Sequence, residues 1–158
     1  TDVAYDLIMT AGSELSALLA DELWSLVGAS SNPQAAGFVL EMVKTIRGLG
    51  GIAVTSTQGM QDLFGLEGGK YGKGILDSSR LKIVMQMEEQ EARLIQGVLN
   101  LSEDEVRQIT RFRRGEGLLC FGYNHVPISI YVTPKEYEAI TTSPTDRQAM
   151  LERRQADE

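Results

Sequence analysis

Short apolar runs alternate along this chain with longer segments whose apolar residues recur at helical spacing. Three runs have the length and composition of buried strands, namely Leu15–Ala20, Ile52–Thr55 and Leu81–Met87. Helix-like segments separate them, and no internal repeat is visible. This alternation is typical of an α/β domain, with a mostly parallel sheet flanked by helices.

The helix expected after the first strand has clear start and stop signals. Asn32 is a favourable N-cap, and Pro33 is suited to the first helical position. Glycines at 48, 50 and 51 are expected to end this helix. The apolar face of this helix consists of Ala36, Val39, Val43 and Ile46.

The start of the chain is expected to hold the end of another helix, over Asp2–Ala11.

The second half of the chain is expected to hold two helices, a hairpin and a tail. A helix is predicted over Glu88–Leu99, and a capping box at Ser102–Glu105 opens another that runs to about Phe112. A β-hairpin is predicted from strands at 118–123 and 126–133, with His125 in its turn. The tail from Thr141 is polar and is expected to be helical or frayed. We therefore expect one domain over residues 1–143 and a polar tail over 144–158.

Residues 65–74 hold five glycines and two lysines. A phosphate-binding loop has the pattern G-x-x-x-x-G-K-[ST] between a strand and a helix. Here no Ser or Thr follows either lysine, and no helix is evident after the segment. We therefore predict a mobile surface loop at this point.

Composition narrows the classes of protein to consider. The chain has 158 residues and a net charge of −7, which argues against broad nonspecific binding to nucleic acid. No apolar run reaches the ~18 residues of a membrane-spanning helix, so none is expected. Cys120 is the single cysteine and His125 the single histidine, which excludes an internal disulfide and the usual zinc sites. We expect Cys120 in the core, and no catalytic triad is recognisable around His125.

The strongest chemical signal follows the first predicted strand. Four apolar residues, 17–20, lead directly into Asp21 and Glu22, which is the form of a Walker B segment. At the carboxyl end of a buried parallel strand, the first acid is placed to hold Mg²⁺ through water and the second to activate a water molecule. The alternative is a strand that ends in two solvated acids. Trp24 is expected to be a packing residue for the following loop.

Two further polar segments are candidates for the same site. Ser56-Thr57-Gln58 ends the second predicted strand, where a glutamine amide is suited to contact a γ-phosphate or a water molecule; the alternative is a polar turn. Arg114 precedes the predicted hairpin, and Arg47 lies near the end of a predicted helix. Either arginine is suited to contact a phosphate across a subunit interface, although each also fits a simple surface role.

Several motifs follow one another in a distinctive order. The Asp-Glu-x-Trp segment at 21–24 and the Thr-Gln-x-x-x-Asp segment at 57–62 are the most specific. The others are Lys44-x-x-Arg47, Ile75-Leu76-x-Ser78-Ser79, Lys82-Ile83, Leu101-Ser102-x-x-Glu105 and Arg114-Gly115-Glu116-Gly117. This order resembles the C-terminal part of the CagE/TrbE/VirB family of conjugation and type IV secretion ATPases, which are hexamer-forming relatives of the FtsK/HerA motors. The resemblance covers about Leu15 to Ser143.

The resemblance implies roles for individual residues. Asp21 matches the acid associated with Mg²⁺, Glu22 the glutamate that activates water, and Gln58 the glutamine that senses the γ-phosphate, with Thr57 beside it in the ATP site. Arg47 and Arg114 lie in the family's arginine-bearing motifs, and the sequence does not choose between them.

The chain departs from the family pattern upstream. The family's phosphate-binding loop precedes the Walker B strand, but only about fifteen residues do so here, and the chain begins at Thr1 without Met. We therefore expect the C-terminal portion of a RecA-like P-loop NTPase domain, from a longer protein or a truncated gene. Alone, it is expected to lack ATPase activity and to self-associate, or to be covered by something else, because missing strands leave apolar edges exposed.

The resemblance also implies a function for the intact protein. That protein would couple ATP hydrolysis to the transfer of DNA or protein and to pilus assembly. It would be a cytoplasmic hexamer, peripheral at the inner face of the cell membrane, with other secretion-system subunits as partners. Two alternatives remain: a RecA-like scaffold module without hydrolysis, and an unrelated α/β enzyme with a carboxylate pair at a strand end.

Overall fold

The computed structural model describes residues 17–156, with side chains as far as residue 152. The helix end predicted over Asp2–Ala11 lies outside the described residues. The described chain divides into two compact units, one ending at Ile128 and one beginning at Ser129. Within residues 17–156, no helix is both long enough and apolar enough to cross a bilayer. The division expected after residue 143 stays a prediction.

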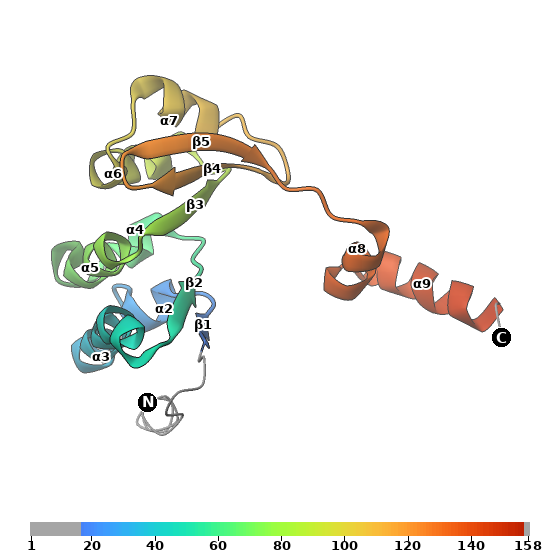
Figure 1. Ribbon diagram of the computed structural model, residues 1–158, viewed down its shortest axis with the longest axis horizontal. Coiled ribbons are helices and arrows are strands. Elements are labelled where there is room, and N and C mark those ends of the chain that lie inside the picture. The colour runs from blue at the N-terminus through green and yellow to red at the C-terminus, as the bar shows by residue number, and fades with distance from the viewer. Residues whose placement is uncertain (1–16, 157–158) are drawn as a thin grey trace. The chain divides into compact units, whose positions relative to one another are not determined.

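The described part of the first unit begins with a parallel pair of strands (Figure 1). β1 (Ala17–Ala20) pairs with β2 (Ile52–Thr55), and Ala20 lies opposite Thr55 at their carboxyl ends. Both strands were predicted from their apolar runs. The connection between them consists of α2 (Trp24–Val27), α3 (Pro33–Thr45) and the short 3₁₀ helix η1 (Ile46–Leu49). Parallel strands need such a crossover, because their like ends lie at the same edge of the sheet.

The predicted helix signals around α3 are confirmed. The side chain of Asn32 accepts a hydrogen bond of 2.8 Å from the Gln34 backbone N–H, and Pro33 occupies the first helical position. Ala36 and Ile46 are buried, and the two valines of the predicted face pack partly buried against the core. Gly50 ends the segment with a φ of 78°, a left-handed conformation that suits glycine.

The glycine-rich segment is a packed helix, so the prediction of a mobile loop is wrong. It follows α4 (Met60–Leu63) and comprises the 3₁₀ helix η2 (Leu66–Gly69) and α5 (Lys70–Ser78). Tyr71 and Ile75 of α5 are buried. A Cβ on Gly72 would lie 2.4 Å from the backbone oxygen of Leu63, so this glycine allows the close approach of two backbones. The glycine content did not indicate this helix, because tertiary packing can override a low local helix propensity.

The second sheet has the strand order β3–β4–β5. β3 (Leu81–Met85) pairs antiparallel with β4 (Glu116–Phe121), and Met85 lies opposite Gly117. Between them the chain forms α6 (Glu89–Leu99) and α7 (Glu103–Ile109), the latter opened by the predicted capping box. The parallel arrangement expected of the domain is thus confined to β1 and β2 among the described strands.

The predicted hairpin is present, but its turn lies elsewhere. β5 (Asn124–Ser129) follows β4 after Gly122 and Tyr123, and Gly122 has a φ of 61°. His125 therefore belongs to β5, which corrects its placement in the turn. Only 8% of its side chain is exposed, and its Nδ1 lies 2.7 Å from Glu105 Oε1 of α7. The left-handed glycine decides where the strands reverse.

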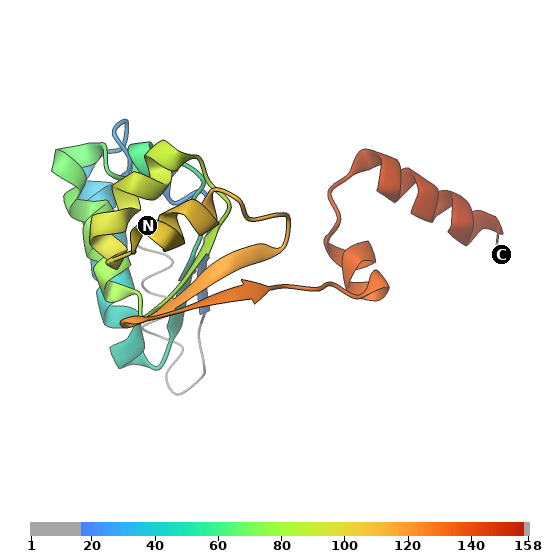
Figure 2. The same ribbon diagram turned by 90° about the horizontal axis from the view of Figure 1, so that it is seen from above.

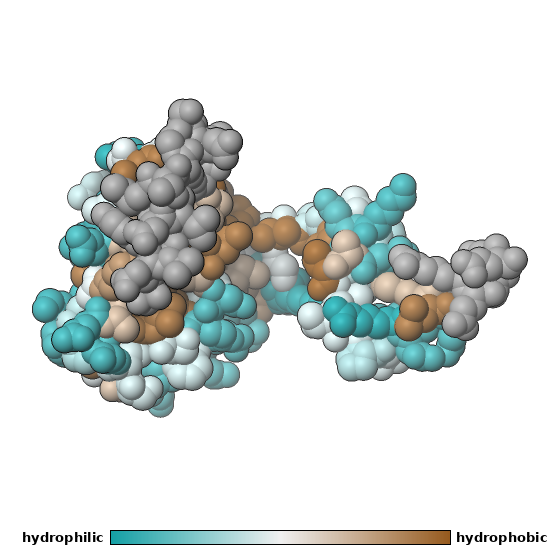
Figure 3. Space-filling view, turned by 90° about the horizontal axis from the view of Figure 1, so that it is seen from below, coloured by the Kyte–Doolittle hydropathy of each residue, from teal (hydrophilic) through white to brown (hydrophobic). Residues whose placement is uncertain are grey.

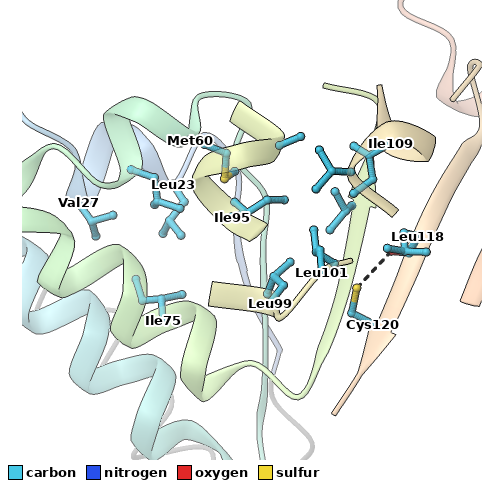
Figure 4. Close-up of a cluster of buried hydrophobic side chains, with 14 of the residues drawn as sticks. Leu23, Val27, Met60, Ile75, Ile95, Leu99, Leu101, Ile109, Leu118 and Cys120 are labelled. Carbon is cyan, nitrogen blue, oxygen red and sulfur yellow. Dashed lines mark hydrogen bonds between the residues drawn. The ribbon is translucent and has the colours of Figure 1, made fainter. Parts of the chain in front are cut away.

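The core of this unit lies between the helices and the sheets (Figure 4). Val27 of α2, Ile75 of α5 and Ile95 of α6 meet there, so the core joins both halves of the unit. Leu118 and Cys120 of β4 close it on the sheet side, and the burial of Cys120 confirms its predicted place in the core.

One face of both sheets is apolar and exposed, while α2–α7 lie on the other side (Figure 2). On β1 and β2, Leu19 is 76% exposed and Val54 is 50% exposed. Ile83 and Phe121 continue this pattern on the second sheet. Figure 3 shows hydrophobic residues at the surface of this unit among hydrophilic ones. Nearly continuous apolar runs are typical of strands buried on both sides, but here helices cover only one face and the other is exposed.

Between Ser129 and residue 156, the second unit contains two helices. α8 (Pro134–Ile140) was not predicted, and it begins with a capping box formed by Thr133 and Glu136. α9 (Pro144–Ala156) confirms the helical option for the tail. The Tyr137 hydroxyl donates a hydrogen bond of 2.7 Å to Asp146 Oδ2, which ties the two helices together.

Candidate functional site

The candidate site lies at the carboxyl ends of β1 and β2. Asp21 and Glu22 directly follow β1, and Ser56 begins the segment after β2. The Ser56 backbone N–H donates to the Ala20 oxygen at 2.9 Å, and the Leu23 N–H donates to the Ser56 oxygen at 2.8 Å. These bonds extend the strand pairing into the loops, so the two predicted polar segments are held side by side.

Asp21 presents an exposed, ordered carboxylate. Its Oδ1 accepts a hydrogen bond from the Ser56 hydroxyl and another, of 2.9 Å, from the Glu22 backbone N–H. The Ser56 hydroxyl, and then the Glu22 N–H, hold the pKa of Asp21 below its ordinary value, because both bonds favour the charged form. Asp21 is therefore a negatively charged oxygen donor at neutral pH.

Glu22 is held by two side chains and an uncommon backbone conformation. Its φ is 51°, in the left-handed region that residues with a Cβ rarely adopt. Its Oε1 accepts a hydrogen bond of 2.8 Å from Gln58 Nε2, and its Oε2 accepts one of 2.6 Å from Trp24 Nε1. Strained backbone that the surroundings impose is concentrated at functional sites.

The carboxylates suit a magnesium ion and a reacting water. Mg²⁺ prefers oxygen ligands and keeps several of its waters, so a single ionised aspartate such as Asp21 is a sufficient protein ligand when phosphates supply the rest. Within residues 17–156 no group of three or more His, Cys, Asp or Glu gathers as a metal site. The residues thus fit a shared, water-rich magnesium site better than a closed one.

Thr57 stands apart from this cluster. Its Oγ1 is buried and has no hydrogen-bond partner among the described residues. The neighbouring Ser56 and Gln58 make the contacts with the two acids. The predicted place of Thr57 in the nucleotide site therefore has no support from a contact to Asp21 or Glu22.

The two candidate arginines lie at different ends of the strands. Arg47, in η1, is exposed and precedes β2, so the length of that strand separates it from Gln58. Arg114 is exposed and precedes β4, whose Gly117 lies opposite Met85 at the carboxyl end of β3. No ion pair involves either arginine in the described part of the chain.

One contact indicates that β2 and β3 end at the same edge. The Met60 N–H, just after β2, donates a hydrogen bond of 3.2 Å to Oε1 of Glu91, in the first turn of α6. Since α6 begins shortly after the carboxyl end of β3, Arg114 belongs to the edge that carries Asp21 and Glu22.

The lysines of the glycine-rich segment are engaged within that segment. Lys70 Nζ lies 3.3 Å from Glu67 Oε2, and Lys73 Nζ donates to the Gly68 oxygen at 3.4 Å. Both lysines thus contact residues of their own segment.

Sequence reasoning missed two members of the site. Ser56 was assigned only to a polar segment, but its hydroxyl contacts Asp21. Trp24 was interpreted as a packing residue, but it is half-buried and its indole N–H contacts Glu22. The available signal for Trp24 was its position two residues after Glu22, because an indole N–H is a donor that needs an acceptor nearby.

Comparisons with known proteins identify the fold. No family model and no curated protein matches the sequence. Among solved structures, VirB4 of Thermoanaerobacter pseudethanolicus is 30% identical with a TM-score of 0.76; the match covers 85% of this chain and 36% of that chain. The genome packaging NTPase B204 from Sulfolobus turreted icosahedral virus 2, in complex with ATP-gammaS, is 16% identical with a TM-score of 0.59; that match covers 84% of this chain and 63% of the other.

The chain therefore has the α/β fold of P-loop ATPase domains and corresponds to the C-terminal portion of a RecA-like domain. More particularly, the fold is VirB4-like. The likeness to B204 concerns the fold alone. The chain spans about a third of the length of VirB4 and about two thirds of that of B204.

Proposed function

We propose that this chain is the C-terminal part of an ATPase domain of the secretion and translocation type, from the CagE/TrbE/VirB family. The observation that carries this proposal is the hydrogen-bonded group of Asp21, Glu22 and Gln58 at the carboxyl ends of two parallel strands. In open α/β sheets, ligands bind at that edge. The likeness to VirB4 adds support.

Each member of the group has a distinct proposed role. Asp21 is the ligand of Mg²⁺, through water, and it is kept ionised by Ser56. Glu22 takes the proton of the attacking water as a general base. Gln58, which already donates to Glu22, turns its amide toward the γ-phosphate or the water. When bound, Mg²⁺ would neutralise charge on the phosphates of ATP.

The groups that cradle the phosphates are proposed to come from a preceding part of a longer protein. The printed sequence contains no G-x-x-x-x-G-K-[ST] motif. β1 and β2 form one sheet, and β3, β4 and β5 form another. In Figure 1, β3 is the strand of the second sheet that lies toward β1 and β2. A strand added between β2 and β3 would join the two sheets and bring a loop beside Gln58, which contacts Glu22.

We further propose that the intact ATPase is a homo-hexamer in which Arg114 reaches the site of a neighbouring subunit. Arg114 is favoured over Arg47 because it lies at the edge that carries the acids, is exposed, and has no ion-pair partner among the residues described. Such an arginine stabilises the charge that develops on the phosphate. The proposed setting is the cytoplasmic, inner face of the cell membrane, with secretion-system subunits as partners and DNA or protein as the transported substrate.

The second candidate is a RecA-like scaffold that does not hydrolyse ATP. It is favoured by one observation: the hydroxyl of Thr57, which was expected in the nucleotide site, is buried and contacts neither Asp21 nor Glu22. Thr57 would then have a purely structural role.

The first test is calorimetry with Mg-ATP on this chain, with its oligomeric mass measured on the same sample. The proposal expects no tight binding by this chain, since the phosphate cradle is elsewhere. It expects Mg-dependent binding and turnover once a preceding segment with a phosphate-binding loop is joined to the chain. If that longer protein binds no ATP, the scaffold replaces the ATPase. If this chain alone binds Mg-ATP tightly, the phosphate cradle is in this chain or is completed by a second copy.

A further inference from the structure

We propose that Trp24 is a positioning residue that fixes one oxygen of the Glu22 carboxylate and leaves the other, Oε1, to take the proton. Its catalytic consequence rests on the function proposed above, whereas the contact itself does not. The indole N–H of Trp24 donates to Oε2 at 2.6 Å, and Gln58 donates to Oε1 at 2.8 Å. The two oxygens of one carboxylate are thus held by a helix residue and by a loop residue.

The donor on the Oε2 side is anchored by a packed helix. Trp24 begins α2, and its neighbours Leu23 and Val27 are buried. The Leu23 N–H also donates to the Ser56 oxygen, which attaches this turn to the end of β2. An indole has a single donor and no acceptor, so its hydrogen bond to an ionised carboxylate has one fixed direction. Trp24 is therefore suited to hold its oxygen throughout a catalytic cycle.

The donor on the Oε1 side is different in kind. Gln58 is exposed and lies in the loop between β2 and α4. Its flexible side chain ends in an amide that both donates and accepts, so a phosphate or a water can replace Glu22 as its partner. When Gln58 turns away, Oε1 loses its donor while Oε2 keeps Trp24. The structure thereby assigns Oε1 as the basic atom.

The backbone of Glu22 supports the same interpretation. A φ of 51° is unfavourable for a residue with a Cβ, and such a conformation persists only where surrounding contacts impose it. Here the Glu22 N–H is held by Asp21 and the carboxylate by Trp24, both within three residues of chain. The tight turn and the indole together set the direction of the Glu22 side chain.

The contact is testable on this chain without nucleotide, because Trp24 is its only tryptophan and yields one indole N–H resonance. Exchange of that proton with water, measured by NMR, is expected to be about tenfold faster in Glu22→Ala than in wild type. Gln58→Ala should change it less than twofold, and so should Glu41→Ala, a control at an exposed position of α3. Unchanged exchange in a folded Glu22→Ala protein would make Trp24 a packing residue only.

The catalytic role is tested by Trp24→Phe in the longer ATPase that contains this segment. Phenylalanine keeps most of the ring packing but has no N–H, so kcat should fall about tenfold while KM for ATP stays the same. Equal kcat values for wild type and variant would overturn the positioning role. If wild type does not hydrolyse ATP at all, the proposed function fails instead, and the indole exchange alone decides whether Trp24 holds Glu22.

Discussion

Gln58 Nε2 lies 2.8 Å from Glu22 Oε1, although 36 positions separate the two residues in the sequence. Parallel pairing of β1 and β2 explains this proximity, because it brings the carboxyl ends of both strands to one edge. A carboxylate and an amide placed in this way suit the activation of water beside a phosphate.

Replacing Glu22 by Gln is expected to preserve Mg-ATP binding and to abolish hydrolysis in the longer ATPase. The amide has nearly the shape of the carboxylate but cannot accept the proton, so turnover should fall by about 10²-fold or more. Steady-state phosphate release and calorimetry measure the two effects. Glu41→Gln, at an exposed position of α3, is the matched control and should behave as wild type. Normal turnover by Glu22→Gln would exclude Glu22 as the base.

Replacing Gln58 by Ala is expected to slow hydrolysis while leaving the fold intact. The side chain is exposed, so its loss should change stability by less than about 0.5 kcal/mol. Thermal unfolding and phosphate release on the same samples separate the two effects. Gln61→Ala removes another exposed glutamine, three residues further along in α4, and should leave turnover unchanged. Equal rates of phosphate release in Gln58→Ala and Gln61→Ala would show that Gln58 is only part of a polar turn.

Two glycines in helices provide a matched test of the packed glycine-rich segment. Gly72→Ala in α5 would place a Cβ 2.4 Å from the Leu63 backbone oxygen, so we expect a loss of about 1–3 kcal/mol of stability. Gly97→Ala in α6 meets no atom within 4 Å and should raise stability by up to about 1 kcal/mol. Chemical denaturation measures both. If Gly72→Ala were as stable as Gly97→Ala, α5 would not pack against α4 as described.

Acid should weaken the start of α7 through Glu105. Burial raises the pKa of Glu105, but hydrogen bonds from Ser102 and His125 outweigh burial and leave the pKa below the ordinary value of 4.5. A lowered pKa in the folded state means that the charged form stabilises the fold above the unfolded-state pKa, and that this contribution is lost as pH falls through the folded-state pKa.

Glu105→Gln tests that expectation. At pH 7 the variant should be less stable than wild type by about 1 kcal/mol, the usual magnitude of a helix cap. The difference should shrink as pH falls below 4.5, because wild-type Glu105 is then increasingly protonated. Denaturation curves from pH 7 to pH 3 measure it, with Glu41→Gln as the control. A difference that is constant over this range would show that the charge of Glu105 does not matter.

The exposed apolar face of the sheets should cause self-association of this chain. Leu19→Ser combined with Val54→Thr removes two exposed apolar side chains from adjacent strands, so sedimentation should show a smaller mean mass at the same concentration. Leu94→Ser is the control, because Leu94 is 44% exposed but lies on α6, away from this face. If the double variant associates as strongly as wild type, a different surface is responsible.

Helix starts were predictable from the sequence where a few neighbouring residues decide the local structure. Asn32 with Pro33 predicted the start of α3, and the Ser102 capping box predicted the start of α7. The segment around Gly72 was mispredicted, because its helical state depends on Leu63 and the buried Tyr71, and no local rule contains those contacts. The position of the hairpin turn depended on Gly122, whose left-handed backbone a simple apolar pattern does not indicate.

For the candidate site, the sequence by itself determined the chemical groups and their order: two acids after one strand, and a serine and a glutamine after the next. Apolar periodicity and local residue types are sufficient for this, because strand ends and polar loops are local properties. Only the tertiary structure decided which groups meet. The amide of Gln58 reaches Glu22 because parallel pairing of β1 and β2 joins parts of the chain 36 positions apart. The indole of Trp24 reaches Glu22 because the backbone of Glu22 is left-handed, a conformation that the apolar pattern does not indicate.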